Sequence, residues 1–364
     1  MKIPEKLCIV LLMIRLLVIH TSAEPLPDSL TDALPPAAEE LLDEIHAEDY
    51  NALTLSDGLQ QLAGRVGELF LSLFRDQLGG AVLLLIVVIL CGVTGDLHTA
   101  GAPDGSPRFI PMAGALVIAT IAVGRVRSLM ELGVDTMEQL DIFAKSLLPT
   151  LSAAVAAGGG YVTAGVQQVS TVLFTNLLLS LIRKLLLPMV YVYVAVAAAD
   201  AMLPEHDLKR LRGGIGKGIT WSLTALLAVF TAYLTVSGAA GTSADSVTLR
   251  LTRSAISTAV PVVGSVISDA AESVLASAGV LRTSIGVFGM LGVLATCLTP
   301  FVHLAVQYLT YKLTAFLASV VGSESLVELI DALGSAFGLV LGMTGACALL
   351  LLIAVASAVK VVVT

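Results

Sequence analysis

The chain has 364 residues, of which 56% are hydrophobic and only 13% are charged, and its formal net charge is −8. A soluble globular domain carries about 25% charged residues, so the composition excludes that class and predicts an all-α polytopic membrane protein. The negative charge has a local source, because the acidic residues between Glu24 and Asp57 have no lysine or arginine among them. It therefore does not indicate an acidic binding protein.

Residues 1–23 have the pattern of a secretory signal peptide. Lys2 and Lys6 precede an apolar core from Leu7 to Ile19, and small residues end the segment before Glu24. Arg15 interrupts the apolar core, which leaves an uncleaved membrane anchor as the alternative. Either reading delivers the next segment outside the cytoplasm.

Residues 24–75 form an acidic extracytoplasmic segment, and the polytopic membrane domain follows at 76–364. The start of this segment is rich in proline, and helical spacing of apolar residues begins after Ala37. The segment either docks on a partner or on its own membrane domain, or it is a solvated linker.

Six apolar stretches are long enough to cross a bilayer. They lie at 78–94, 109–124, 185–203, 219–236, 285–311 and 336–359. Residues 125–148 alternate charged and apolar positions, which predicts an amphipathic helix and not a span. Residues 204–218 form a basic loop, and the positive-inside rule places such loops in the cytoplasm.

The stretch 149–182 is rich in alanine, glycine and serine. Pro149 opens it, and the consecutive glycines Gly158, Gly159 and Gly160 should break or kink a helix. Irregular backbone at membrane depth is tolerated only where protein or a water-filled cavity covers it. We therefore predict a broken or re-entrant helix here.

A second small-residue helix is predicted from Ile256 to Leu281, with Pro261 near its start. Its polar face carries Ser265, Ser268, Asp269 and Glu272. If this face lies at membrane depth, it lines a polar pathway. If the helix lies at the membrane interface, the two carboxylates are simply solvated.

Two further patterns concern packing and ancestry. Gly334, Gly338 and Gly342 fall four residues apart, which predicts a close helix–helix contact. The pairs Pro149/Pro188 and Pro261/Pro300 are both separated by 39 residues, with an offset of 112 between the pairs. This spacing suggests repeats at 109–220 and 221–332, a plan common in transporters.

Catalytic and cofactor patterns are absent from the sequence. The five histidines are scattered and the four cysteines lack metal-ligand spacing. The run Gly213–Thr220 departs from a phosphate loop because Gly218 follows Lys217 where serine or threonine is required. The sequence thus predicts no enzyme, no cofactor, no metal site and no nucleic-acid module.

Several segments together resemble the stage III sporulation protein AE family of endospore-forming bacteria. They are the signal sequence, the acidic lead, LLPTLSAAVAAGGG, the run from Ala255 to Gly289, and PFVHLAVQYLTYKL. The resemblance implies a multi-pass protein of the mother-cell membrane around the forespore. It also implies assembly with the other stage III sporulation A proteins in a channel or secretion-like complex that supports late forespore gene expression.

The leading function is therefore a membrane component of that sporulation complex, in contact with lipid and able to form oligomers. The alternative is a secondary transporter of a small solute or ion that uses the two small-residue helices as its gate. The family has no established catalytic residues, so the resemblance assigns none to this chain.

Overall fold

The structure, a computed structural model, describes residues 33–44, 55–99, 109–202, 208–259, 264–320 and 323–360. Every element within these ranges is a helix. The predicted all-α membrane fold is therefore confirmed for this part of the chain. The predicted signal peptide lies outside the described residues.

Nine helical elements follow one another along the chain in the described ranges. They are α3 (Pro36–Glu44), α4 (Leu55–Thr99), α5 (Phe109–Ala157), α6 (Tyr161–Leu181), the π-helix η2 (Ile182–Leu186), α7 (Leu187–Met202), α8 (Lys209–Ala259), α9 (Gly264–Ala318) and α10 (Glu324–Lys360). Because α6, η2 and α7 are continuous, six of the helical rods are long and apolar enough to cross a membrane.

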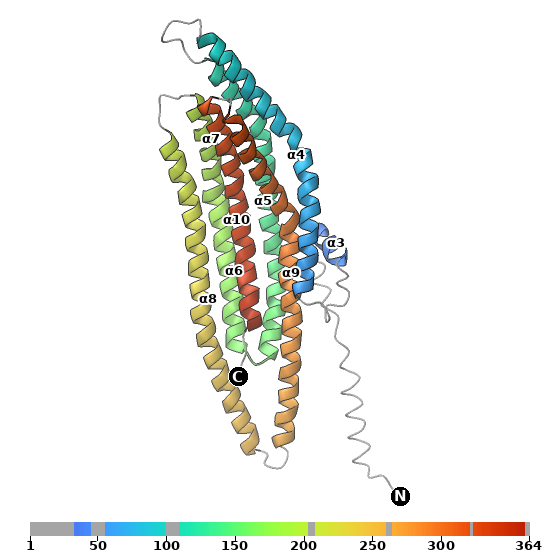
Figure 1. Cartoon of the computed structure of the whole chain (residues 1–364). Helices are drawn as coiled ribbons and strands as arrows, with labels where there is room; N and C mark the ends of the chain where they lie inside the picture. The colour runs from blue at the N-terminus through green and yellow to red at the C-terminus, as the bar shows by residue number, and fades with distance from the viewer. Residues whose placement is uncertain are drawn as a thin grey trace.

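The long helices run alternately up and down in one elongated bundle (Figure 1). The turn between α5 and α6 lies at the lower end in this view, and the start of α8 lies at the upper end. The most apolar window of α9 is 67% buried and that of α8 only 17%. The bundle is thus built around α9 and α10, with α8 on its outside.

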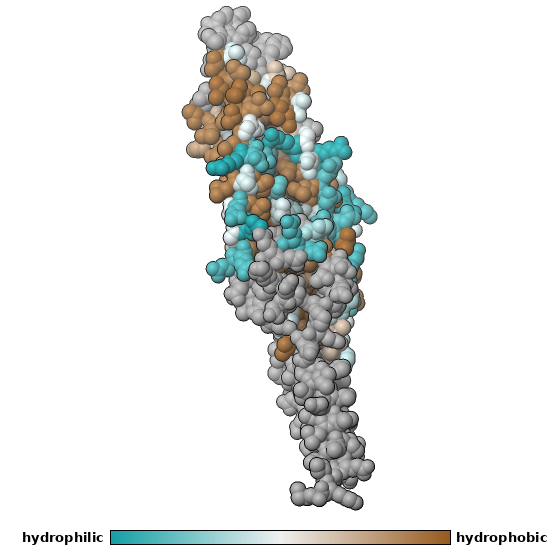
Figure 2. All heavy atoms as spheres, turned by 90° about the vertical axis from the view of Figure 1, so that its right-hand side faces the viewer, coloured by the Kyte–Doolittle hydropathy of each residue, from teal (hydrophilic) through white to brown (hydrophobic). Residues whose placement is uncertain are grey.

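The helices are much longer than a bilayer is thick. At 1.5 Å per residue, the 55 residues of α9 span about 80 Å, whereas a hydrocarbon core is about 30 Å thick. Along α4, large apolar side chains are exposed from Leu78 to Val93, and polar ones such as Glu68 precede them. Figure 2 shows this side of the molecule, with an apolar zone above a hydrophilic one.

The stretch 125–148 was predicted as a separate amphipathic helix, and it is instead the middle of α5. Its charges lie on the outer face and pair one turn apart, as in the 2.9 Å contact between Arg127 and Glu131. Its apolar residues, including Phe143, are buried. One continuous helix therefore satisfies both faces.

Pro149 does not open a new element, because it lies in the interior of α5. Its side chain is exposed, so no neighbouring helix contacts a broken backbone there. The polar stretch 238–253 is likewise not a loop, since α8 runs through it to Ala259.

The boundary predicted between residues 75 and 76 does not interrupt the chain, because α4 passes through it. The described part of the acidic segment is docked on the bundle. Leu34 and Leu42 at α3 are buried, and Leu34 contacts the α9 backbone at Gly292, beside Phe143. The docking alternative holds for these residues.

The helix predicted from Ile256 to Leu281 is divided between α8, which ends at Ala259, and α9, which begins at Gly264. The two run in opposite directions and project below the other helices (Figure 1). Shifting the first turn at 158–160 by 112 residues gives 270–272, which lies inside α9. The order of long helix, turn and long helix recurs, but the turns are not equivalent, so the duplication stays a prediction.

Candidate functional site at the turn between α5 and α6

Three glycines form the tight turn that separates α5 from α6. Gly159 has φ 89°, a left-handed conformation that favours glycine. The amide of Gly160 donates to the carbonyl of Val155 at 3.0 Å, and that of Gly159 donates to Ala156 at 2.8 Å. This is a Schellman motif, which ends a helix by satisfying its last carbonyls.

The next helix begins without a capping side chain of its own, because Gly160 occupies the N-cap position. Asp245 of α8 supplies the cap from 82 residues away. Its Oδ1 accepts a hydrogen bond from the amide of Val162 at 2.8 Å. Its Oδ2 accepts from the amide and the hydroxyl of Thr163, at 3.1 and 2.6 Å.

Asp245 is only 1% exposed. A carboxylate at a helix N-terminus is stabilised both by the orphan amides and by the positive end of the helix dipole. The three hydrogen bonds and this dipole make burial of the charge tolerable, where an isolated carboxylate would be very costly. The contact fixes the start of α6 against α8.

Small residues let the two helices approach at this level. A methyl group added at Gly241, one turn before Asp245, would lie 2.6 Å from the Thr163 hydroxyl. Farther along the same pair, Phe174 of α6 packs on Phe230 of α8, with ring centroids 5.1 Å apart. Two contacts thus set the position of α6 on α8.

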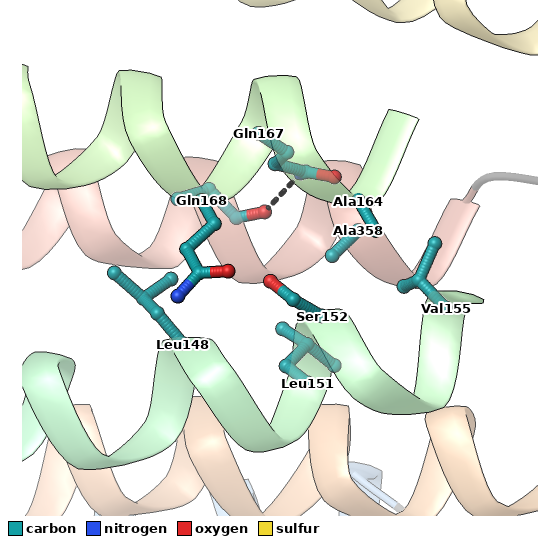
Figure 3. Close-up of a pocket in the computed structure, with 9 residues that line it drawn as sticks. Leu148, Leu151, Ser152, Val155, Ala164, Gln167, Gln168 and Ala358 are labelled. Carbon is teal, nitrogen blue, oxygen red and sulfur yellow. Dashed lines mark hydrogen bonds between the residues drawn. The ribbon is translucent and has the colours of Figure 1, made fainter. Parts of the chain in front are cut away.

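A third link joins α6 to α10. The side-chain amide of Gln167 donates to the carbonyl of Ala354 at 2.8 Å, and both residues are buried. A small pocket opens beside this bond, where Ser152 of α5 and Gln168 of α6 point toward one another (Figure 3). The pocket is lined by Leu148, Leu151, Ser152, Val155, Ala164, Gln167, Gln168, Ala354 and Ala358.

The pocket offers hydroxyl and amide groups but no titratable side chain. It can hydrogen-bond a polar molecule, and it has no acid–base pair with which to catalyse a reaction. No group of three histidine, cysteine or acidic residues that could hold a metal ion is present in the described part of the chain.

The other residues singled out in the sequence lie away from this turn. Ser265, Ser268, Asp269 and Glu272 belong to the lower part of α9, whose side chains are not described, and Pro261 lies outside the described residues. These residues therefore keep both interpretations, the polar pathway and the solvated face.

The three spaced glycines of α10 are not equivalent. A methyl group at Gly334 would lie 3.1 Å from Cβ of Tyr311, and one at Gly338 would lie 3.1 Å from the Tyr308 ring. Gly342 is exposed and would have no neighbour within 4 Å of such a methyl group. Including Gly342 in the close contact was wrong, because α10 turns that position outward.

Asp245 was not singled out by sequence reasoning. It stands in a run of small and polar residues that resembles a loop, and its partners lie 82 and 83 residues away. The available signal is the acidic residue itself, isolated within GAAGTSAD. A glycine run with no capping residue of its own leaves helix amides to be satisfied from elsewhere.

The sequence model of the stage III sporulation protein AE family matches residues 42–362. The chain belongs to the stage III sporulation protein AE family. A curated relative, stage III sporulation protein AE of Bacillus subtilis (strain 168), is 21% identical over 266 residues, covering 72% of this chain and 67% of the relative. No solved structure matches. The resemblance noted in the sequence is thereby confirmed, and with it a role in sporulation for this multi-pass protein.

Proposed function

We propose that the chain is a membrane component of a channel or secretion-like complex between mother cell and forespore. In this proposal it resides in the mother-cell membrane around the forespore and acts without catalysing a reaction. Family membership supports the sporulation setting. The observation that carries the proposal is that the bundle is far taller than one bilayer.

The lower half of α4 supports a position outside the membrane for the lower part of the bundle. The exposed apolar stretch from Leu78 to Thr94 is about 25 Å long at 1.5 Å per residue, close to the thickness of a hydrocarbon core. Below it on the same helix, Arg65 pairs with Glu68 at 3.1 Å, and both side chains are largely exposed. Such an ion pair is stable in water and costly in lipid.

The charge at the two ends supports an orientation. Lys209, Arg210, Arg212 and Lys217 lie at the upper end of α8, which the positive-inside rule assigns to the cytoplasm. The three rods α4, α5 and α6–α7 separate this end from a translocated N-terminal segment, so the number of crossings is odd. The lower part of the bundle would then stand in the space between the two membranes.

A protein that projects into that space can hold partners there. The other stage III sporulation A proteins are the partners we propose, together with lipid around the apolar zone and further copies of this chain. Both the docked α3 and the projecting ends of α8 and α9 lie on the lower, extracytoplasmic part in this orientation (Figure 1).

Site-directed labelling tests the orientation on the full chain, expressed in the membrane of vegetative cells with its native cysteines replaced. A cysteine at Glu68 should react with a membrane-impermeant maleimide in intact cells. One at Leu211, which is also exposed, should react only after lysis. Leu90, in the apolar zone, is the matched control and should react poorly in both. Labelling at 211 in intact cells would overturn the orientation.

A second experiment tests the complex itself. The tagged chain, purified from sporulating cells, should carry the other stage III sporulation A proteins with it. Its deletion should abolish expression of a late forespore reporter. Normal reporter expression without the chain would contradict the proposal.

A further inference from the structure

Four buried polar atoms without a hydrogen-bond partner of normal geometry gather on one turn of α9. They are both side-chain atoms of the Gln307 amide, the hydroxyl of Thr310 and the hydroxyl of Tyr311. The three side chains are 1%, 3% and 1% exposed. Because residues three and four apart share a helix face, Thr310 and Tyr311 both flank Gln307.

Other buried threonines in the same part of the bundle show how such groups are normally satisfied. Thr314 donates to the carbonyl of Thr310 at 2.7 Å, and Thr344 donates to that of Val340 at 3.2 Å. The turn at 307–311 lacks this arrangement. An unsatisfied buried polar group costs about 1–3 kcal/mol, so a structural contact at Gln307 and Tyr311 would be more stable with leucine and phenylalanine.

A cation lies next to this turn. The guanidinium of Arg125, on α5, rests on α4 where Gly80 has no side chain, since a methyl group there would lie 2.4 Å from Nη2. It is within electrostatic range of Tyr311. Among the described residues its hydrogen bond goes to the neutral amide of Gln77 at 3.0 Å, with no carboxylate partner. A charged group within a candidate span is a functional site by default.

We propose that Arg125, Gln307, Thr310 and Tyr311 form a contact site for a small anion, closed in the present structure. The inference deepens the proposed channel role and rests on it. The four side chains offer a guanidinium, an amide N–H₂ and two hydroxyls as donors. An anion is the ligand that would satisfy these donors and neutralise the charge of Arg125 together.

The surroundings set the size of the ligand and explain the closed state. Tyr311 packs edge-on against Phe337 of α10, with ring centroids 5.1 Å apart, and its Cβ lies against Gly334. The four unpartnered atoms are sealed from water. Entry of an anion therefore needs α9 and α10 to separate slightly at this level, and only a small ion fits.

The test measures thermal unfolding of the purified full-length chain in detergent, with chloride replacing bulky methanesulfonate at constant ionic strength. Chloride should raise the Tm of the wild type saturably. The rise should be lost in Arg125→Gln, weaker in Arg125→Lys, and shifted to roughly tenfold higher chloride in Tyr311→Phe, the effect of one lost hydrogen bond. Phosphate and acetate, tested in the same way, define the anion class.

Arg127→Gln is the matched control, because Arg127 is exposed, lies two residues away and pairs with Glu131. It should respond to chloride as the wild type does. Equal responses of the two arginine variants, or no saturable response to any of the three anions, would overturn the site. Gln307→Leu should also raise Tm in the absence of chloride, and a fall would show that this amide is already satisfied.

Binding to the purified chain and support of the forespore are separate measurements. Failure to bind anions removes the site and leaves the sporulation role untouched. A chain that binds chloride yet is dispensable for late forespore expression would contradict the proposed function alone.

Discussion

The two hairpins at the lower end of the bundle are built in different ways. The α5–α6 turn is closed by a Schellman motif, capped by Asp245 and tied to α10 through Gln167. The α8–α9 hairpin projects below the other helices (Figure 1), so its ends are supported only by each other. The comparison teaches that α8 serves both hairpins, since it clamps the first just before it leaves the bundle to form the second.

The difference has a consequence for local stability. Segments with few buried contacts open at low free energy, and those in a packed core open only with the whole molecule. We therefore expect the amides of α6 near Thr163 to resist hydrogen exchange, because their partners are buried. The projecting ends of α8 and α9 should exchange first.

Removal of the clamp gives the largest expected effect. Asp245→Ala leaves two amides and one hydroxyl of α6 buried without an acceptor, at a cost of about 3–5 kcal/mol. Thermal unfolding in detergent should show a much lower Tm, and hydrogen exchange should show lost protection at residues 161–165. Ser243→Ala is the control, since Ser243 is exposed and bonds only its own helix. Equal Tm values for the two variants would mean that the clamp contributes nothing.

A leucine on the inner face of α10 is next in size and tests the upper support of α9. Gly338→Leu should cost about 1–3 kcal/mol, the usual range for overpacking, because the Tyr308 ring already lies 3.1 Å from a methyl group at this position. Protein level and Tm are the measurements. Gly342→Leu is the matched control on the exposed face and should change neither. If both variants behave as the wild type, α9 and α10 do not depend on this close contact.

The third change tests the turn backbone without touching a side chain. Gly159→Ala places a Cβ in the left-handed region, which costs about 1–2 kcal/mol. Gly158→Ala, one residue earlier, meets its neighbour at an ordinary 3.4 Å and should be neutral or slightly stabilising. A difference in Tm between two adjacent Gly→Ala variants would be the signature of the turn. Identical values would mean that Gly159 is not held with positive φ.

Sequence reasoning reached the features that depend on local chemistry. The glycine run at 158–160 predicts the break, because few other residues accept its conformation, and apolar length predicts the spans. It failed where tertiary contacts decide. Charges at Arg127 and Glu131 suggested a surface helix, yet they pair on the outer face of a continuous α5. Asp245 could not be matched to its partners, because sequence spacing carries no information about a contact across 82 residues.

The smallest expected effect concerns the projecting hairpin, where Asp269 and Glu272 lie one turn apart on the lower part of α9. Side chains at this spacing leave a helix on the same side. Asp269→Asn combined with Glu272→Gln preserves their shape and removes two charges. In water this costs little, since exposed substitutions usually stay within about 0.5 kcal/mol. We expect normal abundance and normal spore yield, because this part of α9 projects beyond the rest of the bundle.

The same double variant decides whether the hairpin conducts. If its polar strip lines a conduit, forespore support should fall while abundance stays normal, because the variant changes charge and not packing. Spore yield and protein level must therefore be measured in the same cells. Asp245→Asn is the useful contrast on α8, since it alters a buried carboxylate in the clamped hairpin and should lower Tm. A loss of spores from the α9 variant at unchanged Tm would make the projecting hairpin the functional part and the clamped one its support.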